Sequence, residues 1–131
     1  MSNNQVKKLE IMISAWNKIC YCRDTHNTEI SGWLVSSSQD NLFECNDFIT
    51  TKQTDTAASI EFDDEDLARF SFEMIQKGIL PCMCQKIWLH THPGNSCQPS
   101  GTDETTFTEM LSKIDNGDFL IMMIVAMNDE T

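Results

Sequence analysis

Two histidines and an aspartate lie close together in residues 88–104, WLHTHPGNSCQPSGTDE, and these residue types could bind a metal ion. His90 and His92 are two apart in a run that predicts a strand, so both side chains should project from one face. Pro93 biases His92 towards extended backbone and carries the strand geometry up to the second imidazole. Asp103 falls in the first turn of a predicted helix, from which it could face the same point. Two imidazoles and one carboxylate suit Zn²⁺, and three protein ligands leave a fourth position for water, as in catalytic zinc sites.

Each of these residues also has an ordinary interpretation. An H-x-H pair alone is often a surface or core feature. Asp103 could simply be an acid favoured by the helix dipole, and Ser100 a loop serine. The joint pattern, H-x-H-P followed by S-x-x-D, is much more specific than its parts and therefore favours the metal site. Cys97 lies in the same loop and is expected to be a spectator.

Strands and helices that alternate along the chain must position these groups. Strands are expected over residues 5–13, 28–37, 41–50, 59–62, 85–92 and 118–127, and helices from Ser14 to Arg23, over 63–78 and from Thr102 to Asn116. The two later helices are expected to bury apolar faces made of Leu67, Phe70, Met74 and Ile75, and of Phe107, Met110, Leu111 and Ile114. The second and third strands should form a hairpin, and residues 93–101, with two prolines and two glycines, a loop. This order favours a layered α/β or α+β domain.

Composition sets broader limits. The 131 residues, 40% of them hydrophobic, are expected to form a single domain over 1–131. A net charge of −11, from 20 acidic and 9 basic residues, argues against a nucleic-acid partner. The longest apolar run, residues 119–127, is far shorter than the ~20 residues that cross a bilayer, and the N-terminal stretch does not resemble a signal peptide. The six cysteines are expected to be reduced thiols, so we predict a cytoplasmic protein with no membrane partner.

The stretch from His90 to Asp103 resembles the JAMM motif of the MPN+ (JAB) metalloprotease family, which reads H-x-H, seven residues, then S-x-x-D. The family also has a glutamate in an early strand, usually followed closely by a glycine. This chain has Glu29 in TEISGWL, with Gly32 after it. The order of strands and helices is similar as well, so the resemblance extends from about residue 5 to 127.

The resemblance implies a curved mixed β-sheet flanked by helices, related to the cytidine deaminases. It implies one Zn²⁺ per chain, bound by His90, His92 and Asp103. Glu29 would be the general base without ligating the metal, and Ser100 would steady the tetrahedral intermediate. Without the motif downstream, Glu29 would be interpreted as a surface acid at a strand edge.

The function implied is that of a zinc-dependent isopeptidase or peptidase that cuts after the C-terminal glycine of a ubiquitin-like protein or its conjugate. Two alternatives stay open: a non-catalytic MPN scaffold module, and a JAMM hydrolase acting on a sulfur-carrier or other small amide adduct. The short segments 46–58 and 112–118 leave little room for insertions and favour a compact, prokaryotic-type member.

The apolar strand near the C-terminus would be an exposed sheet edge, which proteins usually protect. Either the protein is minimal, or the sequence ends inside a longer domain, and we favour the second. A partner chain or a dimer contact could also cover this strand.

Overall fold

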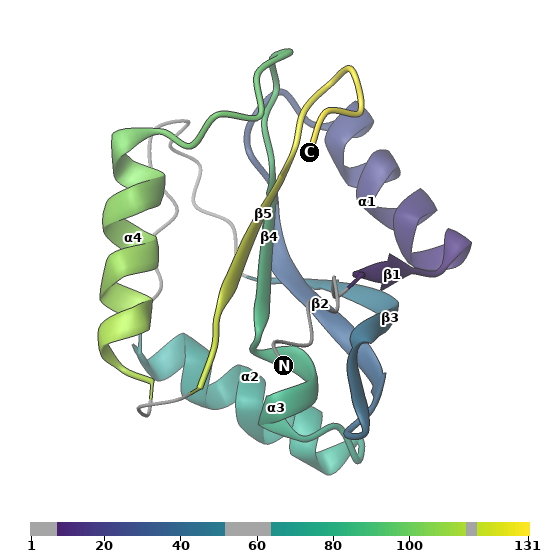
Figure 1. The fold of residues 1–131 in the computed structure, drawn as a ribbon, viewed down its shortest axis with the longest axis vertical. Helices are drawn as coiled ribbons and strands as arrows, with labels where there is room; N and C mark the ends of the chain where they lie inside the picture. Colours follow the sequence, from purple (N-terminus) through teal and green to yellow (C-terminus); the bar gives the residue numbers. More distant parts are fainter. Residues whose placement is uncertain (1–7, 52–63, 115–117) are drawn as a thin grey trace, which may run out of the picture.

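A computed structural model describes residues 8–51, 64–114 and 118–131. The secondary structure of these residues is, in chain order, β1 (Glu10–Ile11), α1 (Ile13–Thr25), β2 (Ser31–Ser38), β3 (Asn41–Thr50), α2 (Asp64–Gln76), α3 (Pro81–Cys84), β4 (Ile87–Thr91), α4 (Gly101–Ser112) and β5 (Ile121–Val125) (Figure 1). The strand expected over 59–62 and the helix end expected at Asn116 lie outside the described residues. The other expected strands and helices are present, most of them shorter than predicted.

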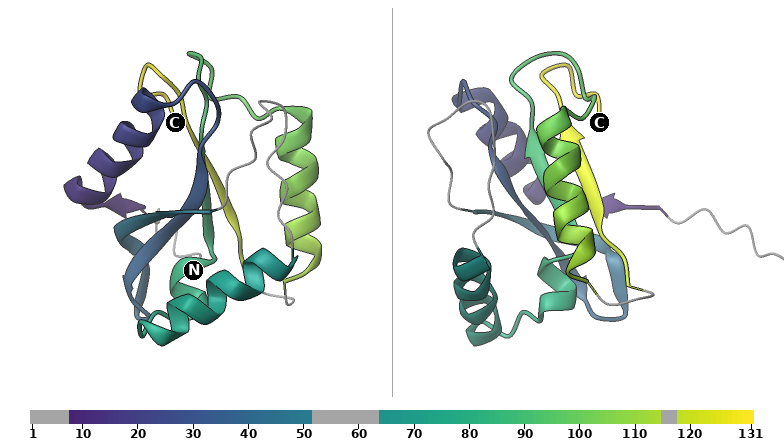
Figure 2. Two further views of the ribbon diagram at one scale, coloured as in Figure 1. Left: turned by 180° about the vertical axis from the view of Figure 1, so that it is seen from behind. Right: turned by 90° about the vertical axis from the view of Figure 1, so that its left-hand side faces the viewer.

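The strands form one curled, mixed five-stranded sheet in the order β1-β3-β2-β4-β5 (Figure 2). Strand β2 is antiparallel to both of its neighbours, whereas β1 is parallel to β3 and β5 is parallel to β4. The predicted hairpin between β2 and β3 is confirmed, with Gln39 and Asp40 at its turn. The fold is therefore the mixed α/β arrangement that the sequence predicts, with β5 at an edge of the described sheet.

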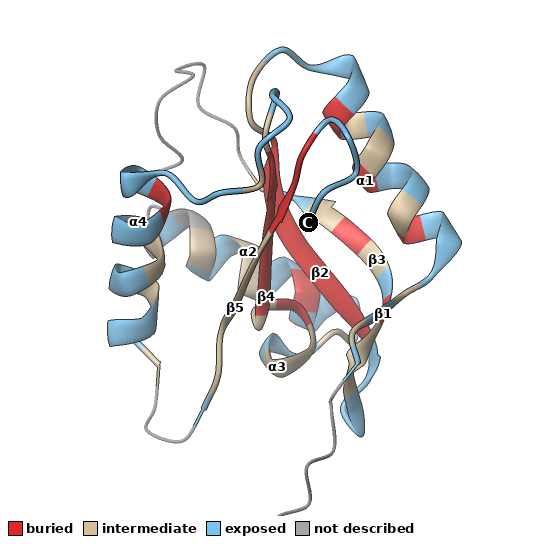
Figure 3. Ribbon diagram, turned by 45° about the horizontal axis from the view of Figure 1, so that its top comes forward, coloured by how far each residue is buried: buried red, intermediate tan, exposed pale blue. Residues whose placement is uncertain are grey.

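Apolar residues pack on both faces of the sheet, because successive side chains of β2 point in opposite directions. Leu34 joins a buried cluster with Ile19 of α1 and Leu89 of β4. Val35 joins a second cluster, which includes Met74 of α2 and Cys84 of α3. Figure 3 shows that burial is concentrated in β2 and β4. The two strands that flank the candidate site are thus among the most buried parts of the described sheet.

The start of α1 differs from the prediction. The helix was expected to begin at Ser14, but Ser14 lies inside it, because Met12 occupies the N-cap position and its carbonyl accepts the Trp16 N–H at 3.0 Å. The Met12 N–H donates to the Cys45 carbonyl at 2.9 Å. Pairing with β3 therefore decides where the helix begins, and a local capping signal does not.

The connection from α2 to β4 contains the short helix α3, which was not predicted. Gly78, at a positive φ of 79°, follows the end of α2, as the sequence suggested. Pro81 occupies the first turn of α3, where its missing N–H is harmless. Ile75 is 50% exposed, so its predicted place on the buried face of α2 is wrong. No helix within the described ranges is long and apolar enough to cross a membrane.

Candidate metal centre

Strand register brings Glu29 to the histidines. Strands β2 and β4 pair with Ser31 opposite His90 and Gly32 opposite Leu89. Continuing this antiparallel register by two residues places Glu29 opposite His92. The Glu29 Oε1 atom indeed lies 3.4 Å from His92 Nε2.

Gly32 is required where β2 passes β3. A Cβ atom at this position would lie 2.3 Å from the Ile49 carbonyl oxygen and 2.7 Å from the Phe48 ring. Only glycine fits so close an approach. The glycine that follows Glu29 in the sequence therefore has a packing role in the strand that carries the glutamate.

The two histidines lie at the C-terminal end of β4, and β5 supports them. The His92 N–H donates to the Val125 carbonyl at 2.9 Å, so the pairing with β5 continues past the end of β4. His92 Nδ1 lies 2.9 Å from the Ser96 carbonyl oxygen. A carbonyl can only accept, so Nδ1 must carry a proton, and in the neutral ring Nε2 then has the free lone pair. In metal sites, a hydrogen bond from the other ring nitrogen usually orients a histidine ligand in this way.

Helix α4 positions Asp103 through a capping box. The Ser100 hydroxyl accepts the Asp103 N–H at 3.1 Å, and Asp103 Oδ2 accepts the Ser100 N–H at 2.8 Å. Such reciprocal bonds satisfy two of the N–H groups that a helix start leaves free. The S-x-x-D spacing thus fixes the start of α4, and it also holds one carboxylate oxygen towards β4.

Four potential ligand atoms converge. Glu29, His90, His92 and Asp103 each contribute one, and all four atoms lie within 4.8 Å of one another. Asp103 Oδ2 is 3.2 Å from His92 Nε2 and 3.3 Å from His90 Nε2. This group could hold a metal ion. Ser100 joins it through Asp103, so the structure connects all five predicted site residues.

The donor set fits a cation on chemical grounds. Neither ring nitrogen of the fully buried His90 makes a hydrogen bond to the described residues, although Nε2 is close to Asp103. Buried polar atoms without a partner are rare and costly. In neutral His92 the Nε2 lone pair would face oxygens of both Asp103 and Glu29, which repel it. A cation between these atoms would remove the repulsion and give one of the two His90 ring nitrogens a partner.

The two carboxylates differ in their electrostatics. Burial raises the pKa of the Glu29 carboxyl above its ordinary value, and the nearby histidines only partly offset this effect. Burial also opposes ionisation of Asp103, but the adjacent His90 and the Ser100 N–H outweigh it and hold the pKa of Asp103 well below its usual range. Asp103 is thus poised as a permanent anion, and Glu29 as a group that takes up a proton more readily.

The cluster is open on one side. The exposed fraction of the side chain is 0% for His90 and 6% for Asp103, but 12% for His92 and 23% for Glu29. A molecule from solvent would therefore reach the cluster first at Glu29 and His92.

Trp88 forms part of the wall behind His90. Its ring lies 4.7 Å from the His90 ring, centroid to centroid, and its Nε1 donates to Ser31 Oγ at 2.7 Å. Both residues are buried. The sequence analysis did not identify Ser31 or Ser96. Their roles depend on pairings between strands and within a loop that no local pattern records.

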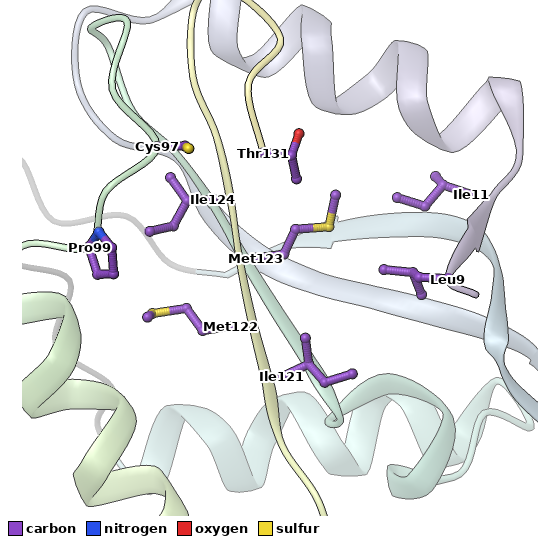
Figure 4. Close-up of a pocket in the computed structure, with 9 residues that line it drawn as sticks. All are labelled: Leu9, Ile11, Cys97, Pro99, Ile121, Met122, Met123, Ile124 and Thr131. Atoms are coloured by element: carbon purple, nitrogen blue, oxygen red, sulfur yellow. The ribbon is translucent and has the colours of Figure 1, made fainter. Parts of the chain in front are cut away.

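A separate apolar pocket of about 450 Å³ lies along β5. It is lined by Leu9, Ile11, Cys97, Pro99, Ile121, Met122, Met123, Ile124 and Thr131 (Figure 4). None of the four potential metal ligands lines it. The expectation that a partner chain, a dimer contact or further sequence covers β5 stays a prediction.

Comparison with models of known protein families gives no match, and comparison with curated proteins gives none either.

All six cysteines are free thiols in the structure. Burial raises the pKa of Cys45 and of Cys84 to about 11, so both are protonated at neutral pH.

Proposed function

We propose that the chain is a zinc-dependent peptidase or isopeptidase of the JAMM type, acting after the C-terminal glycine of a ubiquitin-like protein. The observation that carries this proposal is the convergence of Glu29, His90, His92 and Asp103 within 4.8 Å. In the proposal, the two histidines and Asp103 hold the metal. Two imidazoles, one carboxylate and an open position are the donor set of a catalytic zinc site.

Bound Zn²⁺ would supply Lewis acidity: it polarises a carbonyl and makes a water acidic enough to ionise near neutral pH. The protein's own groups do the rest. Glu29, whose pKa burial raises, accepts the proton of the attacking water and later delivers it to the leaving amine. Its 23% side-chain exposure leaves room for that exchange.

Ser100 would contribute a hydrogen bond to the developing oxyanion. Its hydroxyl oxygen accepts the Asp103 N–H, so its own proton remains available to donate. Loss of one such donor raises the barrier by ~2.7–4 kcal/mol in a well-studied hydrolase. We therefore expect Ser100→Ala to slow hydrolysis by roughly 10²- to 10³-fold.

The proposal is tested with a fluorogenic fusion to the C-terminus of a ubiquitin-like protein, assayed with zinc-loaded protein. Phenanthroline should abolish hydrolysis and thiol alkylation should not, because no cysteine belongs to the cluster. Glu29→Gln should retain zinc and lose roughly 10²- to 10⁴-fold in turnover, the usual contribution of a general base. The exposed Glu109→Gln is the matched control.

Other outcomes point elsewhere. Inhibition by alkylation alone would indicate a cysteine mechanism. If the zinc-bound protein cleaves small amide adducts but no ubiquitin-like fusion, the proposed hydrolytic mechanism stands and the proposed substrate is wrong. Zinc-bound protein that cleaves neither would favour a scaffold module.

A further inference from the structure

A hydroxyl group connects the strand of the histidines to the backbone next to Glu29. Thr91 lies between His90 and His92 and is 1% exposed. Its Oγ1 accepts the Ile30 N–H at 3.0 Å, and its own N–H donates to the Ile30 carbonyl at 2.9 Å. One residue of β4 therefore holds Ile30 on both sides.

The bond to Ile30 constrains Glu29 because of peptide geometry. The amide nitrogen of Ile30 lies in the same rigid plane as the Cα and carbonyl of Glu29. Fixing the direction of this N–H therefore fixes the backbone from which the Glu29 side chain projects. Regular pairing of β2 with β4 begins only at Ser31, opposite His90, so Glu29 lies beyond the paired residues. The hydroxyl bond extends the cross-strand connection to the residue next to it.

Successive side chains of a strand point to opposite faces, so the residues that face the cluster and the residue that holds Ile30 can be neighbours in β4. His90 and His92 face the cluster of potential metal ligands, while the intervening Thr91 has the opposite orientation in β4. Its hydroxyl can thus hold the neighbouring backbone without entering the cluster. The distance that this arrangement maintains is the 3.4 Å between Glu29 Oε1 and His92 Nε2.

We propose that Thr91 is a positioning residue that sets Glu29 against the metal ligands through its hydrogen bond to the Ile30 amide. The inference rests on the proposed function for its catalytic consequence, but the placement of Glu29 can be tested without activity. Thr91→Val keeps the shape of the side chain and removes the acceptor, whereas Thr91→Ser keeps the acceptor. Thr50→Val, at the exposed end of β3, is the control for the general effect of replacing a threonine by valine.

The first readout is amide hydrogen exchange of the metal-free protein, followed by NMR. Thr91→Val should accelerate exchange at Ile30 by about twofold to tenfold, as expected from loss of one neutral hydrogen bond. Exchange at the buried Leu34 serves as reference, so a general loss of stability is separated from local opening. Thr91→Ser and Thr50→Val should leave the ratio of the two rates unchanged.

The second readout is a crystal structure of metal-free Thr91→Val, in which the distance between Glu29 Oε1 and His92 Nε2 should increase.

In the zinc-loaded enzyme the variant should lower kcat by about tenfold to a hundredfold, the usual effect of a misplaced catalytic group. The dissociation constant for Zn²⁺ should change by less than about threefold, because the three ligands are untouched. Thr91→Ser should restore kcat.

Three results would overturn the inference: unchanged exchange at Ile30, an unmoved Glu29 carboxylate in the variant, or a loss of kcat that simply follows loss of zinc. If Thr91→Val does not fold, Thr91→Cys replaces it, since a thiol is only a weak acceptor. If the wild-type protein hydrolyses nothing, the proposed function fails, yet the exchange and crystallographic results still decide whether Thr91 places Glu29.

Discussion

Zn²⁺ added to the metal-free protein should raise its melting temperature, because the folded state alone assembles the ligand atoms. At a free zinc concentration 100 times the dissociation constant, binding stabilises the folded state by ~2.7 kcal/mol. For a domain of this size, about 4 °C per kcal/mol gives a shift of roughly 10 °C. The metal would also relieve two features of the metal-free site. One ring nitrogen of His90, which makes no hydrogen bond to the described residues, would gain a partner, and the oxygens that face His92 Nε2 would no longer repel it. Differential scanning calorimetry with and without zinc measures the shift.

Variants then separate ligands from the base. His92→Ala and Asp103→Ala should each remove nearly all of the zinc-dependent shift, because each deletes one of three ligands. Glu29→Gln should keep it, since Glu29 is not a ligand in the proposed arrangement. A zinc shift that survives His92→Ala would refute the ligand assignment. A shift that disappears in Glu29→Gln would instead indicate four protein ligands and a structural site, because no position would be left for water.

Two further predictions concern the metal-free protein. The raised pKa of Glu29 means that the folded state binds this proton more tightly than the unfolded state, so the ionised carboxylate costs stability above both pKa values. Glu29→Gln should therefore raise the melting temperature at pH 7, with a gain that shrinks as the pH falls and vanishes below the ordinary glutamate pKa of ~4.3. The exposed Glu109→Gln is the control for the substitution, and a gain from Glu29→Gln that is independent of pH would contradict the reasoning. Ser100→Ala removes the acceptor of the Asp103 N–H and should cost ~1 kcal/mol, or about 4 °C, in thermal denaturation, whereas the exposed Ser37→Ala should cost nearly nothing; equal melting temperatures would show that the capping bond is not needed.

The parts of the site that the sequence could predict depend on short periods along the chain. His90 and His92 share a face because side chains of a strand repeat every two residues. Ser100 and Asp103 meet because a capping box spans three residues, which also explains why α4 begins within one residue of its predicted start. Both relations are local. The spacing of residues predicted that His90 and His92 share a face, whereas the capping bonds between Ser100 and Asp103 were not predicted, although their spacing would have allowed it.

The position of Glu29 could not be predicted in this way. It lies opposite His92 only because β2 and β4 pair with Ser31 against His90, and a register between distant strands is not recorded in either strand. The family resemblance pointed to Glu29, whereas the reasoning from its own segment favoured a surface acid. The bond between Thr91 and Ile30 was not predicted for the same reason. The contact of His92 with Ser96 was not predicted because it depends on the conformation of the loop that follows β4.

The buried faces of helices were predicted less well than the site. Met74 of α2 is buried, but Ile75, next to it on the same predicted face, is half exposed. Leu111 of α4 is 39% exposed, although it was assigned to an apolar face. Helical periodicity identifies an apolar side, but how much of that side is covered depends on the elements that happen to pack against it.

The two carboxylates of the cluster lie in environments that differ in the way the proposed roles of metal ligand and general base require. Asp103 Oδ2 accepts the Ser100 N–H at the start of α4 and lies beside two imidazoles, and its pKa is lowered. Glu29 precedes β2, has no helix start to stabilise its charge, and its pKa is raised by burial. Carboxyl groups whose environments shift their pKa values in opposite directions are the usual way in which a site divides such roles. The lowered pKa suits a ligand that must stay ionised, and the raised pKa suits a group that must exchange a proton. Helix capping and burial in this chain thus support the proposed division of roles, in addition to the resemblance of its motif.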